Sequence, residues 1–178
     1  FIEELQAEAM THAQELADAD QLPGAAQRMW TSALDLRGRE FCFVLNDCVR
    51  EDRKELAAPL AKVTRAINQL CVTAGAGGQE AIHPPDDICY RGGGFDDRYR
   101  SFFAQGRKFR QPAYLATSFL ESKARDFIRM RGGDDCVLWR VRIDPVEKCV
   151  HVNLVTKRVP GLPDEQEYLF APYSAFTV

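Results

Sequence analysis

The chain has 178 residues, which is enough for one domain with a buried core. Its residues are 46% hydrophobic and 28% charged, the balance of an ordinary globular protein. The net charge of −3 argues against nucleic-acid binding, and no apolar run is long enough to span a membrane. Because the chain begins at Phe1 without a methionine and stops at Val178 in mid-pattern, we expect a domain excised from a longer protein. The sequence leaves its compartment open.

The distribution of charge and cysteine narrows the kinds of site that the chain could hold. Segment 88–142 carries twelve Lys and Arg residues against six Asp and Glu residues, which suits a small anionic ligand or a solvated mixed surface. Six cysteines occur without any CxxC spacing, so we expect no zinc site, and disulfides stay possible. We assign no catalytic role to the three histidines and expect no metal.

The first 72 residues are predicted to be helical. An apolar stripe over 2–16 ends at Pro23-Gly24, and further helices are predicted over 25–36 and 40–49. The clearest helix is predicted over 51–70, from the helical spacing of Leu56, Leu60, Val63, Ile67 and Leu70. The glycine-rich segment 73–78 is expected to be a loop.

Residues 86–178 are predicted to form a sheet-rich core. The expected strands are 88–91, 114–119, 136–143 and 150–155, with more strands over 168–178. Helices are predicted over 96–105 and 122–130, and the second ends at Gly132-Gly133. Helices followed by a largely antiparallel sheet make an α+β fold, which we expect to be one domain over 1–178.

Two short motifs in this core have both a structural and a chemical interpretation. Arg91 ends a strand before Gly92-Gly93-Gly94, where its planar fork could hold a phosphate while bare backbone approaches the ligand. A plain turn is the alternative. Thr117 and Ser118 could hold a catalytic carboxylate, or be ordinary strand residues, or Ser118 could cap the next helix. No G-x-S-x-G context supports a serine hydrolase.

The third motif is a pair of glutamates near the end of the chain. Glu165 and Glu167 precede an alternating apolar run, so we expect them at the mouth of a strand, pointing to one face. One carboxylate could stabilise a developing cation while the other handles the proton of a nucleophile. A charged, exposed edge strand is the structural alternative. The Pro- and Gly-rich segment 159–163 before the pair is a candidate recognition loop.

Together, these three motifs resemble the R-S-E class of ADP-ribosyltransferases, which have an arginine on a first strand, a Ser-Thr-Ser strand and a Glu-x-Glu. The corresponding segments here are Tyr90-Arg91-Gly92, Ala116-Thr117-Ser118 and Glu165-Gln166-Glu167. The resemblance covers about 51–178, and includes the helix segment Arg65–Leu70 and the closing segment 167–178. It implies a split pair of mainly antiparallel sheets with NAD bound between them.

The resemblance also implies roles for single residues. NAD would be bound by Tyr90, Arg91, Gly92, Gly93, Thr117, Ser118 and Glu167. Glu167, supported by Thr117 and Ser118, would stabilise the ribosyl cation, and Glu165 would activate an arginine of a protein substrate. Leu162 would contact that protein, and Phe119 and Arg125 would line the nicotinamide side.

One departure from the pattern keeps other functions open. Ala116 stands where the family has the serine that orients the catalytic glutamate, so Thr117 or Ser118 must take over that role. An NAD glycohydrolase uses the same cation, with water as acceptor. Two alternatives are not active enzymes. One is a catalytically impaired member of the family that acts as a binding module, and the other is an unrelated α+β interaction domain.

Overall fold

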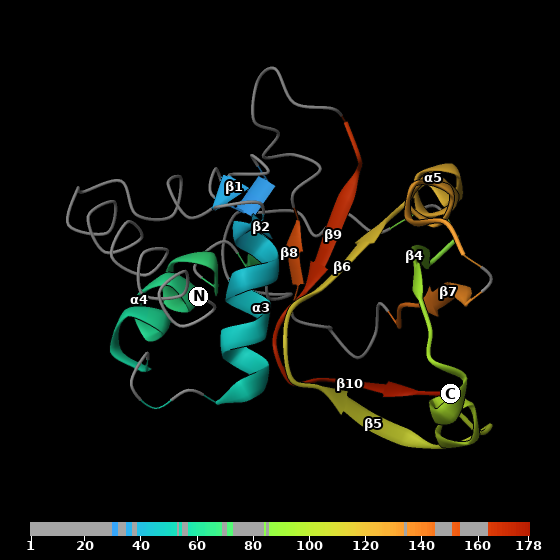
Figure 1. Ribbon diagram of the computed structural model, residues 1–178, viewed down its shortest axis with the longest axis horizontal. Coiled ribbons are helices and arrows are strands. Elements are labelled where there is room, and N and C mark those ends of the chain that lie inside the picture. Colours follow the sequence, from blue (N-terminus) through green and yellow to red (C-terminus); the bar gives the residue numbers. More distant parts are fainter. Residues whose placement is uncertain are drawn as a thin grey trace. The chain divides into compact units, whose positions relative to one another are not determined.

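The computed structural model describes residues 30–31, 35–36, 39–52, 54, 57–68, 71–72, 84, 86–133, 135–144, 151–153 and 164–178 (Figure 1). The chain divides into two compact units, 1–71 with 158–162, and 72–157 with 163–178. The predicted helical stripe over 2–16, the loop over 73–78 and Leu162 lie outside the described residues. A single domain over 1–178 stays a prediction.

The described residues of the first unit include the helices α3 (Phe41–Glu51) and α4 (Ala57–Asn68) and a short hairpin of β1 (Asp35–Leu36) and β2 (Arg39–Glu40). The helix predicted over 40–49 is confirmed. The helix predicted over 51–70 is wrong at its start, because Asp52 takes a left-handed conformation (φ 51°) that ends α3. The helix predicted over 25–36 is wrong at its end, where β1 pairs with β2.

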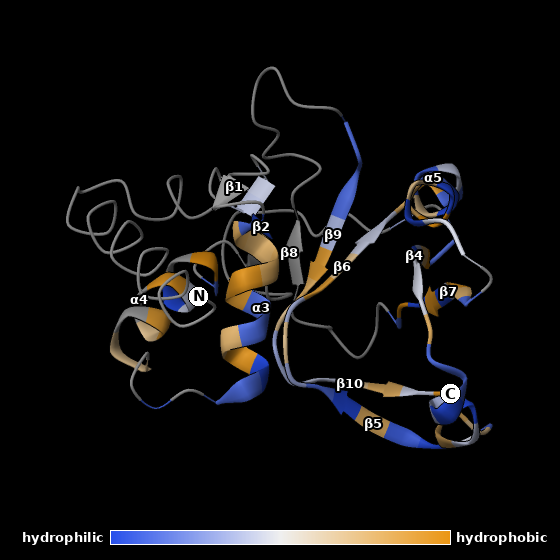
Figure 2. Cartoon of the chain, in the orientation of Figure 1, coloured by the Kyte–Doolittle hydropathy of each residue, from blue (hydrophilic) through white to orange (hydrophobic). Residues whose placement is uncertain are grey.

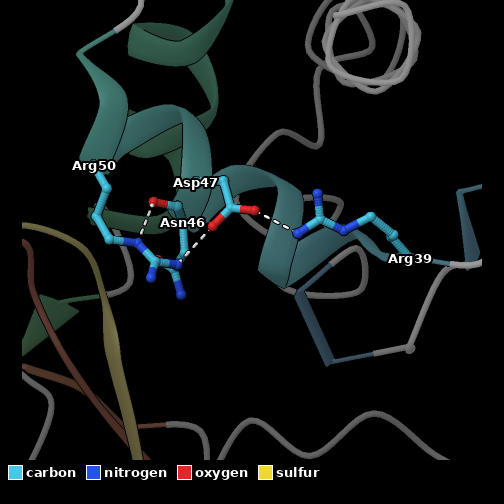
Figure 3. A network of polar contacts seen from close by, with 4 residues as sticks. All are labelled: Arg39, Asn46, Asp47 and Arg50. Atoms are coloured by element: carbon cyan, nitrogen blue, oxygen red, sulfur yellow. Dashed lines mark hydrogen bonds and ion pairs between the residues drawn. The ribbon is translucent and has the colours of Figure 1, made fainter. Parts of the chain in front are cut away.

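Apolar spacing accounts for the orientation of α3. Its buried residues recur at helical spacing and are Phe41, Val44, Leu45 and Cys48, so one face of the helix is apolar (Figure 2). Figure 3 shows polar contacts that join α3 to the hairpin. The carboxylate of Asp47 pairs with Arg39 and with Arg50 (2.8 Å), and Arg50 also donates to the carbonyl of Asn46 (3.2 Å). These side chains are partly exposed, so the pairs contribute little to stability.

The second unit is built on a six-stranded sheet, which carries the three sequence motifs. The strands run in the order β3-β8-β9-β6-β4-β7, and their bounds are β3 Cys71–Val72, β4 Ile88–Gly94, β6 Leu115–Ser118, β7 Cys136–Arg142, β8 His151–Asn153 and β9 Glu167–Phe170. The pairs β7–β4, β4–β6, β6–β9 and β9–β8 are all antiparallel. The predicted α+β class is confirmed.

A second, two-stranded sheet pairs β5 (Lys108–Gln111) with β10 (Ser174–Thr177), two segments that are far apart in the sequence. Aromatic rings join it to the larger sheet. Phe176 of β10 packs edge-on against Phe170 of β9 (5.2 Å between centroids) and stacks on Phe109 of β5 (5.6 Å). Phe103 continues these contacts to Trp139 of β7 (4.9 Å). The segment predicted as a helix over 96–105 is a 3-10 helix over Asp97–Phe102.

Helix α5 (Glu121–Arg131) explains the glycines that follow Arg91. All three glycines lie within β4, so the expected turn is wrong. A Cβ on Gly92 would come within 1.8 Å of the carbonyl oxygen of Ala124 in α5, whereas a Cβ on Gly93 would meet nothing within 4 Å. Gly92 therefore allows the close approach of strand and helix, and Gly93 faces open space.

These two neighbours give a matched test of the packing. We expect Gly92→Ala to lower the free energy of unfolding by about 1–3 kcal/mol, because the clash is with backbone that must shift. Gly93→Ala should leave stability unchanged or raise it by less than about 1 kcal/mol. Urea unfolding of the two variants measures the difference, and equal effects would contradict the close packing of β4 on α5.

Candidate active site

The three motifs of the sequence lie on three neighbouring strands of the larger sheet. Tyr90 of β4 pairs with Ser118 of β6, and Ser118 pairs in turn with Glu167, the first residue of β9. Directly paired residues of antiparallel strands point to the same face. Tyr90, Ser118 and Glu167 therefore form one row across the sheet, although 77 residues separate the first from the last in the sequence.

Strands β4 and β6 part beyond this row, and Arg91 bonds across the opening. In the described part of the chain their register consists of the one pair Tyr90–Ser118. Arg91 leaves β4 on the face opposite Tyr90, and its Nη1 donates to the carbonyl oxygen of Ala116 (2.8 Å). The half-buried guanidinium thus holds the strand that carries Thr117 and Ser118.

Ser118 is 6% exposed, and its hydroxyl continues the hydrogen bonding where the ladder between β6 and β9 ends. Its Oγ donates to the carbonyl of Glu165 (2.6 Å) and accepts from the backbone N–H of Leu120 (2.9 Å). A hydroxyl has one hydrogen to donate, so in this structure Ser118 donates to the backbone of Glu165 and not to the carboxylate of Glu167. The alternative of Ser118 as the helix cap is wrong, because Leu120 is the N-cap of α5.

Thr117 lies in the next position along β6 and points to the other face. It is 5% exposed, and its hydroxyl donates to the carbonyl of Tyr168 (2.7 Å), its paired residue on β9. That bond adds a side-chain link between the two strands. The structure therefore separates the adjacent hydroxyls: Thr117 ties the strands together, and Ser118 holds the backbone of the Glu-x-Glu segment.

The two glutamates are held in different ways. Glu167 begins β9 within the ladder, whereas Glu165 precedes the strand. Gln166 between them takes a left-handed conformation with φ 45°, so the alternation predicted for a continuous strand does not reach Glu165. The N–H of Gln166 donates to Oδ1 of Asp164 (3.1 Å), and its carbonyl accepts from the N–H of Phe119 (3.1 Å).

Phe119 and Arg125, expected on the nicotinamide side, have contacts of their own. The ring of Phe119 lies 5.5 Å from that of Tyr168 and packs against the core of the sheet. Arg125 is exposed and pairs with Glu121 one turn earlier on α5 (2.6 Å). Similar local ion pairs involve Arg98, Arg100 and Arg129, so the ion pairs of the described residues offset four of the twelve positive charges of segment 88–142.

Sequence reasoning missed two residues of this site, Asp164 and Gln166. An Asp whose side chain accepts from the N–H two residues on is a known turn signal, and it is present in Asp164-Glu165-Gln166. The sequence gives no comparable signal for the left-handed Gln166, because glutamine has no special preference for positive φ.

Other features of the described residues bear on what the site could hold. Among them, no group of His, Cys, Asp and Glu is arranged to bind a metal ion, and no helix is long and apolar enough to cross a membrane. A hollow of about 380 Å³ lies at the end of β4 beside Phe95, Phe103 and Trp139. None of the motif residues lines it.

Comparison with known proteins identifies the fold as that of the ADP-ribosyltransferases. The structure of the Vis toxin of Vibrio splendidus with agmatine superposes with a TM-score of 0.59 at 19% identity, over 96% of this chain and 77% of Vis. The C3 exoenzyme of Clostridium limosum gives 0.58 at 12% identity, over 100% and 85% of the two chains. Exoenzyme S of Pseudomonas aeruginosa, bound to carba-NAD and human 14-3-3β, gives 0.53 at 15%, over 97% and 72%. No protein-family model matches the sequence, and neither does any curated protein.

The bonds made by Ser118 generate a prediction about stability. Ser118→Ala would remove one donor and one acceptor from a buried position, so we expect a loss of about 1–3 kcal/mol in the free energy of unfolding. Ser174→Ala is the matched control, because it removes a single partly buried bond to the carbonyl of Ala171 and should cost about 0.5–1.5 kcal/mol. Urea unfolding of both variants makes the comparison, and a neutral Ser118→Ala would contradict the bridging role.

Proposed function

We propose that this chain is a mono-ADP-ribosyltransferase of the R-S-E class that transfers ADP-ribose from NAD to an arginine side chain of a protein, releasing nicotinamide. The observation that carries the proposal is the row of Tyr90, Ser118 and Glu167 on adjacent strands of an ADP-ribosyltransferase fold. The three motifs come from distant parts of the sequence, and this fold has them on neighbouring strands.

The residues around the parting of β4 and β6 suit an anionic dinucleotide. Arg91 presents a guanidinium there, which pairs well with a pyrophosphate, and its bond to Ala116 holds the side chain in place. Gly93 faces open space, so a ligand can approach the backbone of β4 at that position. In this proposal NAD lies where the two strands part, so that Arg91 and Gly93 reach it from one face of β4 and the row of Tyr90, Ser118 and Glu167 reaches it from the other. Gly92 and Thr117 support the site from within the fold.

The two glutamates divide the chemistry. When the bond between the ribose C1′ and the nicotinamide nitrogen breaks, nicotinamide leaves with the electron pair and positive charge develops on the ribose. Glu167, fixed in the β9 ladder, stabilises that charge. A guanidinium nitrogen of the acceptor then bonds to C1′. Glu165 takes the proton that this nitrogen loses, which matters because an arginine side chain is otherwise fully protonated.

The choice of arginine as acceptor rests on the sequence of the Glu-x-Glu segment. The first position is a glutamate, which in the R-S-E class goes with arginine acceptors, and a carboxylate there can both bind a guanidinium and accept its proton. The Vis structure contains agmatine, a small guanidinium compound, which supports the use of agmatine as an arginine mimic. A protein substrate would approach through Leu162 and its loop.

Nicotinamide release from NAD, with and without agmatine, tests the activity directly. We expect release to rise with agmatine, and the nicotinamide released to equal the sum of ADP-ribosyl-agmatine and ADP-ribose, because the guanidinium and water capture the same cation. If nicotinamide release does not respond to agmatine, the chain is an NAD glycohydrolase or a transferase with another acceptor, and this proposal is wrong. NAD binding without any release would indicate an impaired binding module, and no binding at all would indicate that this fold serves here as an interaction domain without NAD.

Variants of the two glutamates test the division of roles. Glu167→Gln should lower both agmatine modification and NAD hydrolysis by about 10²–10³-fold, through the lost stabilisation of the cation. Glu165→Gln should lower agmatine modification by about 10²-fold and affect hydrolysis much less, because it acts on the acceptor. Glu51→Gln, at the exposed end of α3, is the control. Equal losses of both activities in Glu165→Gln would contradict an acceptor role.

A further inference from the structure

The backbone of the Glu-x-Glu segment is held in one conformation at Gln166, which the sequence does not predict. We call this held conformation and its two hydrogen bonds the lock. Gln166 takes a left-handed conformation that side-chain-bearing residues rarely adopt, at φ 45°. Two hydrogen bonds hold it there, from its own N–H to Oδ1 of Asp164 (3.1 Å) and from the N–H of Phe119 to its carbonyl (3.1 Å). Gln166 is thus a strained residue whose N–H and carbonyl are both held, and it lies between the two glutamates of the proposed catalytic motif. A residue of this kind can fix the positions of its neighbours.

The lock affects one glutamate more than the other. Glu167 belongs to the β9 ladder and is paired with Ser118, so its backbone is fixed independently of Gln166. Glu165 lies on the far side of Gln166, and its backbone is fixed by the bond from Ser118 to its carbonyl and by the conformation of Gln166. A change in the backbone angles of Gln166 would therefore turn Glu165 away while leaving Glu167 in place.

We propose that Asp164 and Gln166 are positioning residues that fix the direction in which Glu165 meets the acceptor. They thereby set how efficiently an arginine, rather than water, captures the ribosyl cation. This inference rests on the proposed function and goes beyond it, because neither residue need touch NAD or the acceptor. Asp164 acts through its side-chain acceptor, and Gln166 acts through its backbone.

The chemistry of these two positions provides matched pairs of variants. Asp164→Asn keeps an oxygen acceptor for the N–H of Gln166, whereas Asp164→Ala removes it. Gln166→Gly adopts positive φ without strain, whereas the β-branched side chain of Gln166→Val strongly disfavours it. An electrostatic role of Asp164 would not separate Asn from Ala, because both remove the charge, and a merely structural role of either residue would lower both activities together.

The test compares agmatine modification with NAD hydrolysis in the four variants. We expect Asp164→Ala and Gln166→Val to lower the ratio of agmatine modification to hydrolysis by about tenfold or more, because Glu165, which takes the proton of the acceptor, is misplaced. Asp164→Asn and Gln166→Gly should keep the ratio within about twofold of the parent, and the KM for NAD should change little in all four. Equal ratios in both members of a pair, or a parallel loss of both activities, would overturn the proposal.

Amide hydrogen exchange separates failure of this inference from failure of the proposed function. If the parent releases no nicotinamide, the proposed function fails, and the lock is then judged on exchange alone. We expect the N–H of Gln166 to exchange at least about tenfold faster in Asp164→Ala than in Asp164→Asn, with the N–H of Tyr168 in the β9 ladder unchanged. The same exchange rate in both Asp164 variants would mean that Asp164 does not hold the turn.

Discussion

The candidate site depends on the hydrogen bonds of one buried residue, Ser118. Its backbone pairs with Tyr90 on one side and Glu167 on the other, and its hydroxyl reaches the carbonyl of Glu165 and the N–H of Leu120. Three strands, the start of α5 and the Glu-x-Glu segment therefore meet at a single residue. A buried hydroxyl is well suited to this position, because one small group both donates and accepts a hydrogen bond.

Aromatic packing gives this arrangement a rigid base. Ring contacts run from Phe119 and Tyr168, next to the motif strands, through Phe170 and Phe176 to Phe109 in the smaller sheet. Each contact buries apolar surface and fixes a relative orientation, and edge-on pairs are favourable beyond the burial of their area. The two sheets of this unit are thus held together by contacts between side chains, while the strands within each sheet are held together by backbone hydrogen bonds.

Much of this unit could be predicted from local patterns. The alternation in Cys136–Arg142 and the apolar runs around Ile88 and Leu115 predicted their strands, and helix α5 was predicted to within a residue at either end. The pairing of β5 with β10 could not be predicted, since each strand has only four residues and its partner is more than sixty positions away. The run Gly92-Gly93-Gly94 suggested a turn, because the contact between Gly92 and Ala124 that requires glycine is a tertiary one.

The motif residues could be recognised from the order in which an arginine, a Thr-Ser pair and a Glu-x-Glu follow one another in the sequence. Their local contacts, however, are hydrogen bonds to backbone carbonyls, which the sequence does not specify. The guanidinium of Arg91 bonds to the carbonyl of Ala116, and every residue type presents that group. Alanine can therefore replace serine at this position without loss of the contact that holds the strand. Ser118 likewise contacts the Glu-x-Glu segment through its backbone, at the carbonyl of Glu165. Where a fold is specified by contacts to backbone carbonyls, side chains can diverge widely while the fold is kept, as at 12–19% identity here.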